Sequence, residues 1–167
     1  GGFHVGLDGR IAVHTIWDRV FRPNCEDPRG MYFVPGFGWQ DIYLLNTDPD
    51  QYGTSSAGKQ IADGRSHING KPLTWWVAMD TLARFGKTLL SRAEFTAGMQ
   101  GSKEGKTCGS DPVTTGHVPG LKSVYGAEQA TGCMWTWSRD IKDVSGPWVY
   151  IMGGDWNSVA PGPRQFF

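Results

Sequence analysis

The sequence predicts a single α+β domain in which loops outweigh regular structure. Of its 167 residues, 39% are hydrophobic, which is enough to form one core. Strand-like runs lie near both ends of the chain, and two adjacent short helices lie between them. The 24 glycines and 10 prolines indicate many turns and few long elements.

The N-terminal part predicts short strands separated by turns. Residues 3–22 begin with alternating apolar and polar side chains on both sides of a turn signal at Asp8-Gly9, which indicates a hairpin. Its apolar positions are Phe3, Val5, Leu7, Ile11 and Val13. Residues 31–34 and 41–45 are predicted strands, and the polar stretch 46–72 is a predicted long loop.

Two helices are predicted in the middle of the chain. Thr74 suits the N-cap and Gly86 the C′ position of a helix over residues 73–86. Ser91 and Glu94 form a capping box that begins a second helix. Both helices are therefore indicated by local signals at their ends.

The remainder is predicted to be a loop followed by strands. Residues 101–123 are polar and rich in Gly and Ser, which indicates a loop. Residues 124–140 hold a turn and then a strand-like aromatic run, and residues 147–152 form the last predicted strand.

The charge and hydropathy of the chain argue against a nucleic-acid partner and against a membrane span. Lys and Arg together number 16, as do Asp and Glu, so the net charge is zero and a nucleic-acid partner is disfavoured. No apolar run reaches the roughly 18 residues of a membrane span.

The first ten residues lack the pattern of a signal peptide, and Gly1 stands where a starting Met would, so we expect a processed chain or part of a longer one.

The chain has three cysteines, Cys25, Cys108 and Cys133. The odd number and the absence of a C-x-x-C pair exclude a complete disulfide framework but leave room for one bridge. We expect free thiols, with Cys133 as a small buried side chain.

Three motifs between residues 73 and 157 resemble one family. They are "LTWWVAMDTLARFGKTLLSRAEFTAGMQG", the pattern Gly132-x-x-Trp135-x-Trp137, and Gly153-Gly154-x-Trp156. In this order they resemble C-type-lectin-like domains of the formylglycine-generating-enzyme type. That resemblance implies two short helices around a small twisted antiparallel sheet.

Stretches in the N-terminal part, together with Glu128–Gly132, make the resemblance more specific. "VFRPNCEDPRGMYFV", "DIYLLNT", "QYGTSSAGKQIADG" and "EQATG" resemble the C-terminal domains of phage tail-fibre proteins and the variable proteins of diversity-generating retroelements, such as the major tropism determinants. The resemblance implies one domain over 1–167, with N-terminal strands or an arm (1–30) and a lectin-like body (31–167).

What the resemblance implies for function is a non-enzymatic virion protein of a phage tail or particle surface. A rigid body would display the loops 46–66 and 101–123 and the segment 153–165 to a host surface receptor, and the chain would form a homotrimer. The expected display residues are Asp155, Asn157, Ser158, Arg164 and Gln165, and the expected structural motif is Trp135, Trp137, Gly153, Gly154 and Trp156.

Family members continue for some tens of residues past the Gly-Gly-x-Trp motif, whereas this sequence ends at Phe167. Either a closing strand is missing or supplied by a neighbour, or the C-terminus is truncated. We expect Phe166 and Phe167 to dock on a partner or to form a disordered tail. The alternative function is therefore a decoration or baseplate protein that binds other capsid or tail subunits.

An enzyme of the same fold is a weaker alternative. The family's catalytic cysteine pair follows the Gly-Gly-x-Trp motif, and this chain has no cysteine after Cys133. Its four histidines, His4, His14, His67 and His117, lack the spacing of a helical metal site and are expected to be scattered over the surface.

Two further ligand sites have weak support, and we otherwise expect no cofactor. Asp48 and Asp50 lie in "NTDPD", whose alternating oxygen ligands make a weak calcium candidate, although Asp-Pro is also a plain turn signal. Four tryptophans are sugar-stacking candidates, although most tryptophans of this fold are core residues. They are Trp39, Trp75, Trp76 and Trp148.

Overall fold

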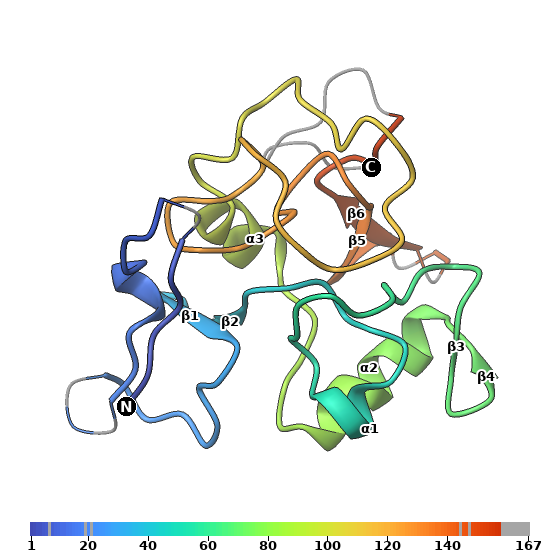
Figure 1. The fold of residues 1–167 in the computed structure, drawn as a ribbon. Coiled ribbons are helices and arrows are strands. Elements are labelled where there is room, and N and C mark those ends of the chain that lie inside the picture. Colours follow the sequence, from blue (N-terminus) through green and yellow to red (C-terminus); the bar gives the residue numbers. More distant parts are fainter. Residues whose placement is uncertain (7, 19, 21, 144, 147, 158–167) are drawn as a thin grey trace.

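The computed structural model describes residues 1–157 except 7, 19, 21, 144 and 147 (Figure 1). Regular elements are short and loops dominate, as predicted. The helices are η1 (Val13–Thr15, 3-10), α1 (Pro49–Tyr52), α2 (Trp75–Arg84) and α3 (Arg92–Gly98). The strands are β1 (Met31–Val34), β2 (Gly38–Asp41), β3 (His67–Ile68), β4 (Lys71–Pro72), β5 (Thr136–Asp143) and β6 (Trp148–Met152). They form three antiparallel pairs, β1–β2, β3–β4 and β5–β6.

Both predicted helices are confirmed at their caps. The Thr74 side chain accepts a hydrogen bond from Val77 N at the start of α2, and Gly86 follows that helix with a φ of 67°. Ser91 and Glu94 form the predicted capping box at the start of α3. None of the helices in the described part of the chain is long and apolar enough to cross a membrane.

The second strand of the first sheet was misplaced by the sequence prediction. β2 covers Gly38–Asp41, and residues 42–45 leave the sheet. The tight turn after β1 causes this shift, because Phe37 N donates to Val34 O at 3.0 Å and pairing resumes at once with Gly38 opposite Val34. The apolar run that follows instead fills the core, where Ile42 is buried.

The stretch 46–72 was predicted as one long loop and holds three short elements. α1 begins at Pro49, where the Asp48 side chain accepts a hydrogen bond from Gln51 N, and β3 and β4 form a small hairpin. Sequence patterns missed these elements because each is only two to four residues long.

The predicted N-terminal hairpin forms a loose ribbon that we call the N-terminal ribbon (residues 1–17). Isolated bridges join Gly2 to Trp17 and Val5 to Ile11, and η1 interrupts the second half. Its predicted apolar position Leu7 lies outside the described residues. The ribbon lies along one side of the molecule (Figure 1, blue).

The main core joins β1, α3 and β6. Tyr32, Phe95 and Met152 are its large buried side chains, together with Val34, Ile42, Met99, Ala127 and Ala130. The Tyr32 hydroxyl donates to Gln40 Oε1 at 2.7 Å, and Gln40 Nε2 donates to Glu94 O at 3.0 Å. A polar chain therefore crosses the core with its groups satisfied, and burial raises the pKa of Tyr32.

A buried segment without regular structure runs through the centre of the molecule; we call residues 126–133 the central segment. All eight of its residues are buried. Its backbone bonds reach distant parts of the chain, with Glu128 N donating to Ile42 O and Ala130 N to Leu121 O, each at 2.8 Å. The Gln129 side chain bonds Thr114 O and Gly116 N. These bonds replace the ladder that a buried strand would otherwise need.

Glu128 ties the N-terminal ribbon to the body. Its buried carboxylate lies 2.9 Å from His117 Nδ1, 3.2 Å from Lys122 Nζ and 3.7 Å from His4 Nε2. The histidines are thus less scattered than expected, because loops distant in sequence bring His4 and His117 to one carboxylate, while His117 is exposed as predicted.

Protonation of the ribbon's histidines opposes folding. Burial, and then the charge of Lys122, lower the pKa of His4 below its usual 6.5, although Glu128 acts in the opposite direction. Burial, and then Arg22, also lower the pKa of His14. Because the folded chain favours the neutral imidazoles, this stability is fully present above the unfolded pKa and is lost as the pH falls through the folded pKa values.

We therefore expect the free energy of unfolding, measured with urea, to fall as the pH decreases from about 7 to about 5. His4→Gln should flatten this dependence in part, and His4→Gln with His14→Gln should flatten it further. His67→Gln, on an exposed residue of β3, is the control and should keep the wild-type profile. Equal profiles for all variants would contradict the assignment.

Candidate binding surface

The segment after β6, Gly153–Asn157, has a backbone fixed by its two glycines. Gly153 and Gly154 have φ angles of 89° and 76°, a region that disfavours other residues. A Cβ at Gly153 would come within 2.8 Å of Phe95 Cζ, in the main core. The turn therefore packs directly against the main core, and only glycine fits at position 153.

The central segment holds this turn along its length. Gly132 N donates to Gly153 O and Trp156 N donates to Cys133 O, each at 3.0 Å. Cys133 and Asp155 form a parallel bridge between the two bonds. Asn157 N donates to Asp155 Oδ1 at 3.0 Å and closes a further turn. The backbone from 153 to 157 is thus bonded at both ends.

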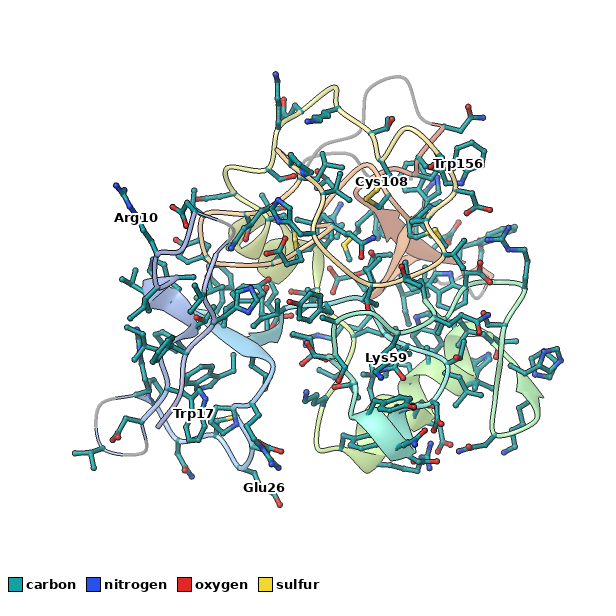
Figure 2. The ribbon with its side chains drawn as sticks, in the orientation of Figure 1. Arg10, Trp17, Glu26, Lys59, Cys108 and Trp156 are labelled. Carbon is teal, nitrogen blue, oxygen red and sulfur yellow. A yellow bond between two sulfur atoms is a disulfide. The ribbon has the colours of Figure 1, made fainter. Side chains whose placement is uncertain are left out.

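A disulfide joins the central segment to the loop 101–123, which corrects the expectation of free thiols. Cys108 and Cys133 are bonded, with their Cα atoms 5.1 Å apart, and Cys25 is free. Cys108 N also donates to Gly132 O at 2.9 Å. Figure 2 shows Cys108 close to Trp156 at the same end of the molecule. The sequence contains no spacing signal for this pair, because the bond closes across 25 residues.

The two predicted display residues that the structure describes lie on this turn. Asn157 is exposed and Asp155 is half-buried. Ser158, Arg164 and Gln165 lie outside the described residues. Trp156, predicted as a structural residue, anchors the turn through its backbone while its side chain is 36% exposed. An aromatic side chain on a fixed backbone therefore faces solvent beside Asn157.

The other motif tryptophans lie inside. Trp135 and Trp137 are half-buried, and Trp137 packs against the smaller core cluster of Ile68, Leu73 and Ala78. Their structural role stays a prediction.

The four sugar-stacking candidates divide into two pairs. The indoles of Trp39 and Trp75 donate to Pro23 O and Ser138 O, respectively, and both side chains are half-buried. Trp76 and Trp148 are exposed, on α2 and β6. The Trp76 ring also meets the Trp75 ring edge-to-face, with their centroids 4.6 Å apart.

A cleft of about 1,090 Å³ is lined by residues of β2, α1 and the turn after α2. Lys87 Nζ lies in this cleft and donates to Asp41 Oδ1 at 2.6 Å and to Thr54 Oγ1 at 2.7 Å. These groups are hydrogen-bonded to each other, so they hold the cleft walls together.

The calcium candidates have protein partners. Asp48 caps α1, and Asp50 Oδ1 lies 3.1 Å from Arg84 Nη1 while its Oδ2 accepts from Asn69 Nδ2 at 2.8 Å. Within the described residues, no group of three or more His, Cys, Asp or Glu side chains is placed to hold a metal ion. Calcium at Asp48 and Asp50 stays an untested prediction.

No protein-family model matches this chain. The chain is 29% identical, over 210 residues, to the "Tail fiber receptor-binding protein" of Bordetella phage BPP-1, covering 96% of this chain and 55% of that protein. The aligned stretch is longer than this chain, so the relative has segments there that the chain lacks.

Solved structures of major tropism determinants are similar throughout. The I1 variant has a TM-score of 0.86 at 28% identity, and the P3c variant has 0.85 at 30%. Each match covers 95% of this chain and 52% of the variant, so the chain spans about half the length of these relatives. The resemblance inferred from the motifs is confirmed, and the fold is the predicted C-type-lectin-like α+β fold.

The close packing of Gly153 against Phe95 can be tested by substitution. We expect Gly153→Ala to lower the free energy of unfolding by about 2–4 kcal/mol, from backbone strain plus overpacking. Gly58→Ala is a matched control, because Gly58 also has a positive φ but no atom within 4 Å of the added Cβ. It should cost about 1 kcal/mol in the same urea titration. Equal costs would contradict the packing argument.

The disulfide predicts a defined thiol count. A maleimide reagent in denaturant should label Cys25 alone before reduction and all three cysteines after it, as read by intact mass. Cys25→Ser should give no label before reduction. Reduction should lower the free energy of unfolding by about 3 kcal/mol, because it frees the closed loop of the unfolded chain. Three labels before reduction would contradict the pairing.

Proposed function

We propose that this chain is a receptor-binding module of a phage tail, and that the turn 153–157 with its neighbouring loops contacts a host surface molecule. One observation carries the proposal. The turn's backbone is fixed by the packing of Gly153 against Phe95 and by hydrogen bonds to the central segment. The Trp156 and Asn157 side chains are exposed on this fixed backbone. The names of its relatives, a tail fibre receptor-binding protein and major tropism determinants, support the same role.

This arrangement favours binding energetically. A fixed backbone loses little conformational entropy when a partner binds, so more of the contact energy remains as affinity. Tryptophan is among the most effective anchors at interfaces, and asparagine can donate and accept hydrogen bonds beside it. The chemistry suits a ligand with an apolar face and polar groups at its edge.

The role we propose is non-enzymatic. Two of the charged groups that line the large cleft, Lys87 and Asp41, are paired with each other and would need to separate before acting in proton transfer. The proposal places the chain on the virion, as a homotrimer in the tail. The alternative, a decoration or baseplate protein, would use the same exposed surfaces against other virion subunits.

The role can be tested by binding of the fluorescently labelled chain to whole Bordetella cells, because one relative comes from a Bordetella phage, and then to a panel of other bacteria. Trp156→Ala should weaken binding by about 30-fold, the loss typical of an interface anchor, and Asn157→Ala by a smaller factor. Both variants should keep the wild-type circular dichroism spectrum, which shows that the loss of binding is not a loss of folding.

Phe37→Ala is the matched control, because Phe37 is an aromatic residue that is 44% exposed in the turn between β1 and β2 and belongs to no candidate binding site. It should bind as the wild type does. No binding to any cell by the wild type, together with capture of purified phage tail proteins, would favour the decoration or baseplate role. Undiminished cell binding by Trp156→Ala would overturn the assigned surface.

A further inference from the structure

The loop 104–110 has no large apolar side chain that could pack it against the core. Its sequence is Glu-Gly-Lys-Thr-Cys-Gly-Ser, and each of these residues is exposed or half-buried. Small polar residues bury too little apolar surface to offset the conformational entropy that a loop loses when it is ordered. Some other contact must therefore hold this loop to the rest of the molecule.

The disulfide between Cys108 and Cys133 is such a contact. It joins the middle of the loop to a fully buried residue of the central segment, and Cys108 N donates to Gly132 O at 2.9 Å beside it. Just after the loop, Asp111 forms an ion pair with Arg65. A covalent bond thus takes the place of the packing that the loop lacks.

The same cysteine holds the candidate binding turn. Cys133 O accepts a hydrogen bond from Trp156 N at 3.0 Å, while Cys133 Sγ is bonded to Cys108. The loop and the turn are therefore fixed to one residue, and Figure 2 shows Cys108 close to Trp156. The disulfide places the loop 104–110 next to the turn that we propose to bind the receptor.

We propose that the Cys108–Cys133 disulfide is a redox switch of the candidate binding surface; this inference rests on the receptor-binding function proposed above. With the bond formed, the loop 104–110 is held beside Trp156 as part of the surface. With the bond reduced, the loop leaves the central segment, and receptor binding must order it again at a cost in conformational entropy. The turn 153–157 keeps its backbone hydrogen bonds in both states, so the switch changes affinity without unfolding the site.

The disulfide is open to thiols from one side. Cys108 is half-buried and Cys133 is fully buried, so a dithiol reductant reaches Cys108 Sγ first. Its thiolate forms a mixed disulfide with Cys108, and Cys133 leaves as a thiolate that takes up a proton. The second thiolate of the reductant then closes a cyclic disulfide and releases the Cys108 thiolate, so two electrons pass to the protein. The reverse reaction takes a disulfide oxidant, such as oxidised glutathione, which is reduced to two thiols.

The surroundings of a phage protein change in the direction that operates this switch. The bacterial cytoplasm, where such a chain is made, keeps thiols reduced, whereas the outside of the cell favours disulfides. A newly made chain would therefore have a free loop 104–110, and a released particle would have a fixed one. The binding surface would be completed only after release from the host.

Trypsin tests the anchoring of the loop, because Lys106 lies within it and Lys103 just before it. Cleavage at these two sites, read by intact mass, should be at least about 10-fold faster in Cys108→Ser than in the wild type. Cleavage after Arg10, which is exposed at the tip of the N-terminal ribbon, is the internal reference and should be unchanged. Cys25→Ser, which removes the free thiol, is the matched control and should be cut as the wild type is.

Equal cleavage of the loop in Cys108→Ser and in the wild type overturns the switch, and so does equally accelerated cleavage after Arg10, which indicates general unfolding. Cys133→Ala replaces Cys108→Ser if the latter loses the wild-type circular dichroism spectrum, because alanine keeps the buried position apolar. Loss of the spectrum in both variants also overturns the switch, since the disulfide is then required for folding.

Cell binding separates the switch from the proposed function. Reduction by a dithiol that is removed before the assay should weaken binding of the wild type at least about 10-fold, as should Cys108→Ser, and oxidised glutathione should restore the reduced wild type. Undiminished binding of the reduced wild type overturns the switch and leaves the proposed function standing. Absence of cell binding in both redox states, with loop cleavage still controlled by the disulfide, overturns the proposed function and with it the control of binding.

Discussion

The fold depends on one constraint: the backbone of the central segment is buried without belonging to a sheet. Every polar group on it must be matched by some other part of the chain, since water cannot reach it. Ile42, Leu121 and Gly153 supply main-chain partners, and the carboxylate of Glu128 collects three basic side chains. Loops that look independent in the sequence are thereby tied to one strip of backbone.

The same constraint sets the stiffness of the candidate binding surface. Cys133 takes part in a disulfide, accepts a hydrogen bond from Trp156 N and lies fully buried. The turn that carries Trp156 and Asn157 is therefore an extension of the core, although it has no regular secondary structure. The turn is pre-organised by hydrogen-bonded polar groups and by the close packing of Gly153 on the core. It does not need long helices or wide sheets for this.

Local signals in the sequence predicted what local forces determine. The caps at Thr74 and Ser91 are formed within a few residues, so both helices were found, and the family motif singled out the glycines at 153 and 154. Non-local pairings were missed. Cys108 meets Cys133, and His4 meets Glu128, only because the folded backbone brings them together. The sequence also could not predict the orientation of the N-terminal ribbon. Alternation identifies its two faces but does not say which one the rest of the molecule covers.

The central segment also has a consequence for the order of events during synthesis on the ribosome. Its partners come from residue 4 near the start of the chain and from residue 153 near the end. Residues 1–125 must therefore be synthesised before the central segment exists, and the central segment gains its Gly153 partner only after β6 has been made. The core of such a chain forms late and in one step. We therefore expect folding to be slow and highly cooperative, without stepwise addition of structure during synthesis.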